Sequence, residues 1–145
     1  MTENKPQTFA NHTRWDPLYH FIALPVFVLC VAGGIVHFIW RPSLHTAAFF
    51  VISVAAAIAV LKIRLYALRV QDRVIRLEEH QRLAPLLPEP MRSRIPELTK
   101  GQLIALRFAS DAEVPKLADR ALAEKLSPAH IKKAIQTWRP DYWRI

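Results

Sequence analysis

The fold of this chain is decided by LYHFIALPVFVLCVAGGIVHFIW (residues 18–40) and SLHTAAFFVISVAAAIAVL (residues 43–61). Neither stretch contains Asp, Glu, Lys or Arg. A helix needs about 20 mainly apolar residues to cross a bilayer, and these stretches supply 23 and 19. Only Arg41 and Pro42 separate them. We therefore predict a tight transmembrane hairpin of two antiparallel helices within residues 17–61.

The charges that flank the hairpin predict its orientation. The loop carries only Arg41, whereas a basic flank follows the second stretch. Because positive residues are enriched in cytoplasmic loops, we expect both termini in the cytoplasm, with residues 1–16 as an N-terminal cytoplasmic arm. Trp15 and Trp40 stand near the ends of the first stretch, as interfacial aromatic residues do. The basic flank consists of Lys62, Arg64, Arg69, Arg73 and Arg76.

The composition as a whole hides this division. The 145 residues are 52% hydrophobic and 22% charged, with a net charge of +8, which are values that a basic soluble domain also shows. Of the 20 Lys and Arg residues, however, only three precede Lys62. This uneven distribution excludes a simple soluble domain and argues against a self-contained soluble enzyme. The single cysteine, Cys30, excludes an internal disulfide and a cysteine-based zinc site.

The second helix is predicted to leave the membrane without a break. No Gly or Pro follows until Pro85, so we expect residues 62–83 to form a cytoplasmic extension of this helix. If residues 43–83 are helical throughout, the helix is about 60 Å long at 1.5 Å per residue. Near the membrane, Lys62 and Arg64 are expected to contact lipid headgroups.

One face of this extension carries an apolar stripe. Its residues recur at spacings of four, four and three, as on one face of a helix. Such a stripe packs on the chain's own C-terminal segment, on a second copy in a coiled coil, or on a partner subunit. The sequence leaves these three alternatives open. The apolar stripe consists of Tyr66, Val70, Val74 and Leu77.

The remaining chain is predicted to form a linker and a small module. Residues 84–97 hold four prolines and are expected to be a semi-rigid, extended linker. Residues 98–145 are expected to form a C-terminal module of three short helices. A core of this size is marginal alone, so the module should dock on the long helix or on a partner. The N-caps of its helices are expected at Thr99, at Ser110 or Asp111, and at Ser127.

The sequence shows no motif for catalysis or for metal binding. There is no GxSxG, no P-loop, no HExxH and no Gly-rich dinucleotide turn. In the C-terminal module, acidic residues are interspersed among Lys and Arg, whereas specific DNA binding needs a focused basic footprint. We therefore expect no enzyme activity, no catalytic or metal-ligating residues and no nucleic-acid partner.

His37 and His45 are the candidate cofactor ligands, near the outer end of the hairpin. A neutral imidazole can ligate the metal of a haem or of a chlorophyll-type pigment. The alternative is an interfacial histidine that is hydrogen-bonded to water, backbone or lipid. We expect no intrinsic cofactor, and at most a bound lipid, pigment or carotenoid at the hairpin surface.

The chain resembles an uncharacterised bacterial family of small two-span membrane proteins, recorded only as a domain of unknown function. The resemblance covers about Ala10 to Ile145 and implies a two-span helical fold with a cytoplasmic tail in the bacterial inner membrane. It implies no activity, cofactor or site residue. The motifs that carry it are NHTRWDPLYHFIALP, RLYALRVQDRVIRLEE, LTKGQLIALRFASD and SPAHIKKAIQTWRPDYWRI.

Together these features predict an all-α, non-catalytic accessory subunit of a larger membrane complex. By analogy with other small subunits, the host would be an energy-transducing assembly, a photosynthetic reaction centre or a respiratory complex. Its partners would be larger integral membrane subunits and membrane lipids. One alternative is a stand-alone scaffold that self-associates through the apolar stripe. A second is a membrane-tethered regulator whose C-terminal module binds nucleic acid.

Overall fold

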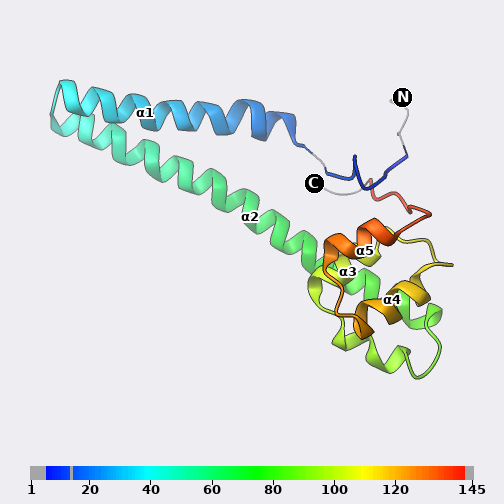
Figure 1. The fold of residues 1–145 in the computed structure, drawn as a ribbon. Coiled ribbons are helices and arrows are strands. Elements are labelled where there is room, and N and C mark those ends of the chain that lie inside the picture. Colours follow the sequence, from blue (N-terminus) through cyan, green and yellow to red (C-terminus); the bar gives the residue numbers. More distant parts are fainter. Residues whose placement is uncertain (1–5, 14, 143–145) are drawn as a thin grey trace. The chain divides into compact units, whose positions relative to one another are not determined.

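The computed structural model describes residues 6–13 and 15–142, and every regular element in them is helical (Figure 1). This confirms the predicted all-α class. The chain divides into two compact units, which we call the hairpin unit (15–69) and the globular unit (6–13 with 70–142). The elements are η1 (Leu18–Ala23), α1 (Leu24–Trp40), α2 (Leu44–Leu86), η2 (Arg92–Glu97), α3 (Lys100–Leu106), α4 (Val114–Ala123) and α5 (Pro128–Ala134).

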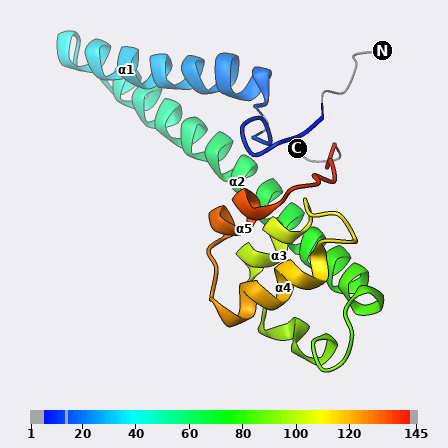
Figure 2. The same cartoon turned by 45° about the vertical axis from the view of Figure 1, so that its right-hand side comes forward.

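The hairpin unit is built around a short turn between α1 and α2. Figures 1 and 2 show the two helices closest near this turn and further apart away from it. The Ser43 hydroxyl accepts the Thr46 backbone N–H at 3.2 Å, and the Thr46 hydroxyl oxygen accepts the Ser43 N–H at 3.0 Å. This reciprocal pair satisfies backbone N–H groups at the start of α2.

The first helix begins with a widened turn next to Pro25. Residues Leu18–Ala23 form a π-helix in which the Leu24 N–H donates to the Tyr19 carbonyl. Pro25 lacks an N–H and leaves a carbonyl one turn earlier without its usual partner. A π turn is one way in which a helix accommodates such a break. The Asp16 carboxylate caps this turn by accepting the Tyr19 N–H at 3.2 Å.

The proline-rich segment 84–97 is folded, so the prediction of an extended linker is wrong. Helix α2 continues through Pro85 to Leu86, and η2 covers Arg92–Glu97. Apolar side chains placed between the prolines anchor the segment, because Leu87 and Ile95 are buried in the core. Their burial outweighs the extended preference of the prolines.

Helices α3 and α5 begin where the sequence predicted. Thr99 forms a capping box with Gln102, and the Ser127 side chain accepts the His130 N–H. Gly101 lets the two helices approach, since a Cβ there would lie 2.8 Å from Cγ of Pro128. α5 ends at Ala134.

Helix α4 does not begin at the predicted cap. It starts at Val114, and its N-cap residue is Glu113, which makes no side-chain capping bond. The Glu113 carboxylate instead accepts the backbone N–H groups of Gln136 and Thr137, at 3.2 and 2.8 Å. This contact holds the chain that follows α5, where Trp138 forms an isolated bridge with Ala109.

Candidate partner and lipid interface

Helix α1 with η1, and the first part of α2, present apolar side chains outward. Both are long and apolar enough to cross a membrane. Only 6% and 11% of their most apolar stretches are buried within the protein. The core helices of a soluble protein bury most of such stretches, whereas these helices leave most of their apolar side chains exposed.

At the seam between α1 and α2, one glycine of α1 meets two phenylalanines of α2. Gly34 is buried, and a Cβ there would lie 3.2 Å from Cα of Phe50. The neighbouring Gly33 faces open space. The small residues Ala55 and Ala59 of α2 are both exposed. A single glycine, Gly34, lying opposite Phe50 therefore allows α1 and α2 to approach closely.

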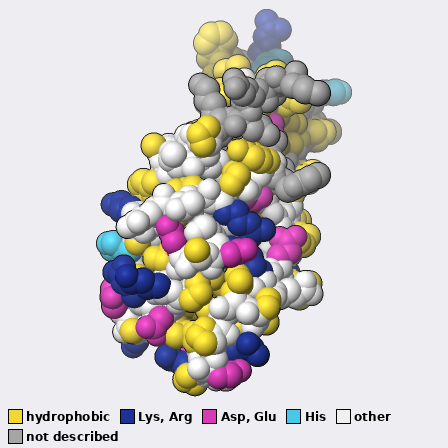
Figure 3. Space-filling model, turned by 90° about the vertical axis from the view of Figure 1, so that its right-hand side faces the viewer, with side chains coloured by type: hydrophobic (Ala, Val, Ile, Leu, Met, Phe, Trp, Pro, Cys, Tyr) yellow, Lys and Arg dark blue, Asp and Glu magenta, His cyan; other side chains and the backbone are white. Residues whose placement is uncertain are grey.

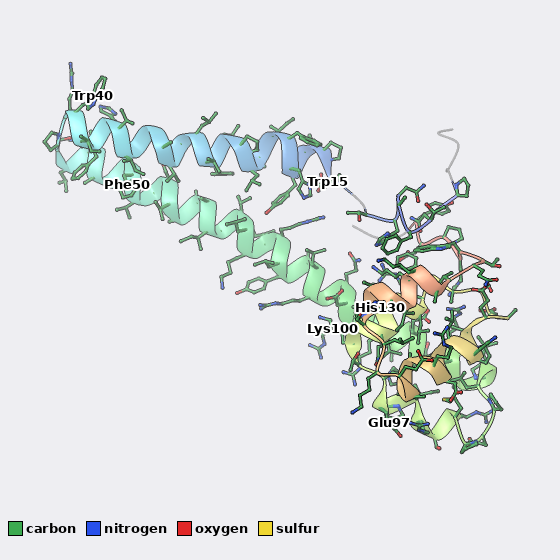
Figure 4. All side chains as sticks on the ribbon, in the orientation of Figure 1. Trp15, Trp40, Phe50, Glu97, Lys100 and His130 are labelled. Atoms are coloured by element: carbon green, nitrogen blue, oxygen red, sulfur yellow. The ribbon has the colours of Figure 1, made fainter. Side chains whose placement is uncertain are left out.

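The turn end of the hairpin carries an open pocket of about 410 Å³. Trp40 lines this pocket, is exposed and lies at one end of the hairpin, with Trp15 at the other (Figure 4). His45 is exposed and does not line the pocket, so the structure does not gather the two candidate histidines there. The lining residues are Gly33, Val36, His37, Trp40 and Arg41.

The basic residues at the other end of the hairpin differ in what they contact. The Arg64 side chain is only 13% exposed, lies 3.8 Å from the Asp16 carboxylate and covers the Tyr19 ring at 5.5 Å. Lys62 is exposed, and its ammonium stands 5.9 Å from the centre of the Tyr66 ring. Lys62 therefore remains open to a headgroup, whereas Arg64 is engaged within the hairpin unit.

The apolar stripe on α2 does not pack on the C-terminal segment, which was the first of our three alternatives. Val70, Val74 and Leu77 are 61%, 48% and 61% exposed. The globular unit covers a different face of α2, where Ile75 is buried. This face is hard to recognise in the sequence because one of its positions is the ionisable residue Glu79.

Glu79 is the centre of a buried ionic cluster in the globular unit. Its carboxylate lies 3.1 Å from the Arg82 guanidinium and 3.6 Å from that of Arg139. Arg82 also donates to Asp111 at 2.6 Å and to the Ala109 carbonyl at 2.7 Å. Burial raises the pKa of Glu79, and the attraction of these guanidinium groups only partly offsets it. The cluster fixes α2 against the loop that precedes α4.

The N-terminal arm docks on the same unit. Both amide atoms of Gln7 bond to the backbone of Asp141, with distances of 2.9 and 3.1 Å. The His12 ring lies among the rings of Phe9, Phe108 and Trp138, with centroid distances of 5.7 to 5.8 Å. The arm is thus held by the last described residues of the chain.

Residues 1–145 match a family whose description is Family of unknown function (DUF6526). The chain belongs to this family. Neither a curated protein nor a solved structure matches it. The DUF6526 description assigns no activity, so function is inferred from the arrangement of this chain.

Three features of this DUF6526 chain were not predicted from its sequence. The arm contact, the Glu79 cluster and the second face of α2 all join residues far apart in sequence. A signal for the last was present, because Ile75, Glu79, Leu83 and Leu87 recur every four residues. In the part of the chain that the structure describes, no three His, Cys, Asp or Glu side chains gather to hold a metal ion.

Proposed function

We propose that the chain is a non-catalytic accessory subunit of a larger membrane protein complex. The observation that carries the proposal is the apolar surface of the hairpin unit, which the chain's own fold leaves uncovered. A subunit that lies between lipid and larger membrane proteins satisfies that surface without a large core of its own. The globular unit would then make the contacts outside the bilayer.

We further propose that the hairpin spans the bacterial inner membrane with both termini in the cytoplasm. Two spans return the chain to its starting side, and the Gln7–Asp141 contact within the globular unit supports this. The basic residues after the apolar part of α2 favour the cytoplasm for that side.

A self-associating scaffold is the second candidate, because the exposed apolar stripe offers a surface for it. For the nucleic-acid regulator we find no support on the visible face of the globular unit. Figure 3 shows acidic and basic side chains interspersed there, whereas nucleic-acid binding needs a focused basic patch.

The proposal is tested by mild-detergent extraction of native membranes followed by native-gel separation. We expect the chain in a high-mass band with larger membrane subunits, and its deletion to lower the stability of that assembly. An absorption spectrum of the band would show haem or chlorophyll if the host is energy-transducing and if His37 or His45 is near a pigment. A small band that holds this chain alone contradicts the accessory role and favours the scaffold.

A further inference from the structure

The apolar stripe of α2 lies opposite the face of the helix that the rest of the globular unit covers. The covered face holds Ile75 and Leu83, which are 6% and 0% exposed. At 100° per residue, the stripe points about half a turn away from these two residues. Lys100 of α3 pairs with Asp72 on the covered side at 2.7 Å (Figure 4). The described part of the globular unit therefore leaves the stripe open to a second helix.

The spacing of the stripe is that of a coiled-coil seam. Val70, Val74 and Leu77 follow one another at intervals of four and three residues, which makes them d, a and d positions of a heptad. A β-branched residue at a with leucine at d, as in Val74 with Leu77, favours two parallel strands. The same register places Ile63 at the preceding d position and Ala67 at a, so the seam covers two heptads of the unbroken α2.

The charged residues beside this seam are complementary between two parallel copies. Arg73 falls at position g and Glu78 at position e of the next heptad. In a parallel coiled coil these positions face each other across the two helices, so Arg73 of each copy faces Glu78 of the other. Both side chains are exposed, and neither takes part in an ion pair within residues 6–13 and 15–142. Two copies therefore gain two equivalent ion pairs, one along each side of the seam.

We propose that the stripe binds a second copy of this chain, in a parallel two-stranded coiled coil over residues 63–78 of α2. The inference rests on the proposed membrane insertion, because two hairpins inserted with the same orientation carry their α2 helices out of the bilayer in parallel. It states that the chain acts as a pair, whether that pair joins larger subunits or stands alone. Anchorage in one membrane raises the effective concentration of the two helices, which offsets the shortness of a two-heptad seam.

A lipid surface does not account for the stripe. Helix α2 is unbroken from Leu44 to Leu86. Val70 and Leu77 follow the last apolar residue of the predicted span, Leu61, by about 14 and about 24 Å of helix at 1.5 Å per residue. The headgroup layer is only about 5–8 Å deep on each side. These two residues therefore lie beyond the reach of the bilayer.

The test is disulfide cross-linking of the full chain in its native membranes. In a Cys30→Ser background, Leu77→Cys places a thiol at a d position, where a parallel coiled coil brings the same side chain of both copies together. We expect oxidation with copper phenanthroline to join most of this variant into a covalent dimer. Arg76→Cys, one residue earlier at an exposed c position, is the matched control and should stay largely monomeric.

Charge reversal then tests the register of the two helices. Arg73→Glu, added to Leu77→Cys, sets carboxylate against carboxylate on both sides of the seam and should slow disulfide formation at least about threefold. Glu78→Arg should slow it similarly, because it sets guanidinium against guanidinium. The double reversal, Arg73→Glu with Glu78→Arg, re-forms both pairs and should return the rate to within about twofold of that of Leu77→Cys alone. A loss of local structure would not be repaired in this way.

The outcomes separate the pairing from the accessory role. A covalent dimer whose rate follows the charge reversals supports the pairing in a large or a small native band, and the size of that band decides the accessory role. Three results overturn the pairing: no dimer of the Leu77→Cys variant, an equal yield from Arg76→Cys, or a disulfide to a different protein. A rate that the double reversal does not restore overturns it as well. The accessory role survives each of these results if the wild-type chain runs in a high-mass band.

Discussion

The hairpin unit and the globular unit satisfy their buried polar side chains in opposite ways. In the hairpin unit, Ser53 and Thr46 are buried, and their hydroxyls donate to carbonyls four and five residues earlier, at 2.8 and 2.9 Å. In the globular unit, the buried side chain of Gln102 donates to the carbonyls of Ala121 and Leu126, 19 and 24 residues later, at 2.9 and 3.1 Å. Hydrogen bonds to nearby carbonyls satisfy the polar side chains of each helix before the helices pack. This suits helices that first insert and then associate.

The largest effect should come from removing the ionic hub of the globular unit. We expect Arg82→Ala to lower the free energy of unfolding of this unit by about 3–5 kcal/mol, because it leaves Glu79 buried without its closest partner. Hydrogen exchange of residues 100–135 in the detergent-solubilised chain measures this loss apart from the hairpin.

The matched control for this change is Arg94→Ala. Arg94 pairs with Glu97 at 3.1 Å, but both side chains are well exposed. A much smaller loss is expected here, because solvent screens such an exposed pair. Equal exchange rates in the two variants would show that the buried cluster does not stabilise the unit.

A smaller effect is expected in the hairpin unit, at the two adjacent glycines. Gly34→Leu should cost about 1–3 kcal/mol, because even its Cβ presses on the backbone of Phe50. Gly33→Leu should be close to neutral, because that position faces open space. Unfolding in SDS, followed by circular dichroism, separates the two. Equal costs would contradict the observed seam.

The next largest effect is expected from a change in the contact between the N-terminal arm and the globular unit. Gln7→Ala removes two hydrogen bonds to the backbone of Asp141 and should cost about 1–2 kcal/mol of arm docking. Limited proteolysis within residues 6–13 should become faster, while α3 to α5 stay protected. Gln136→Ala, at an exposed position, is the control and should leave the cleavage rate of the arm unchanged.

The smallest effect should be the contribution of Glu79 to the dependence of stability on pH. Its folded pKa is raised above 4.5 because burial disfavours the carboxylate. The folded state therefore binds the proton more tightly than the unfolded state, and stability falls as pH rises from about 4.5 through the raised value. Glu79→Gln should flatten this fall in melting temperature as the pH rises above 4.5, whereas Glu97→Gln should not. An unchanged slope would contradict the raised pKa.

The sequence predicts what depends on local pattern. The two apolar stretches, the unbroken start of α2 and the caps at Thr99 and Ser127 follow from composition, spacing and neighbouring residues. The prediction of an extended linker failed because tertiary packing folds the proline-rich segment 84–97, and the same packing buries the face of α2 that holds Glu79.

The candidate interface was only partly predictable for the same reason. The spacing of apolar residues predicted the stripe. Its exposure could not be predicted, because it depends on which face of α2 the rest of the globular unit packs against. The contacts of Arg64 could not be predicted, because they depend on Asp16 and Tyr19 lying opposite it in the folded hairpin unit. The role of His37 and His45 as ligands stays a prediction.

The central claim is that the hairpin unit lies across a membrane, and the single cysteine tests it most directly. Cys30 stands midway along the first apolar stretch. We predict that a membrane-impermeant maleimide does not label Cys30 in intact or in opened membranes, and labels it only after SDS denaturation. In a Cys30→Ser background, Ser43→Cys should react from outside and Ser93→Cys only once the membrane is opened. Rapid labelling of Cys30 in intact membranes would contradict the account.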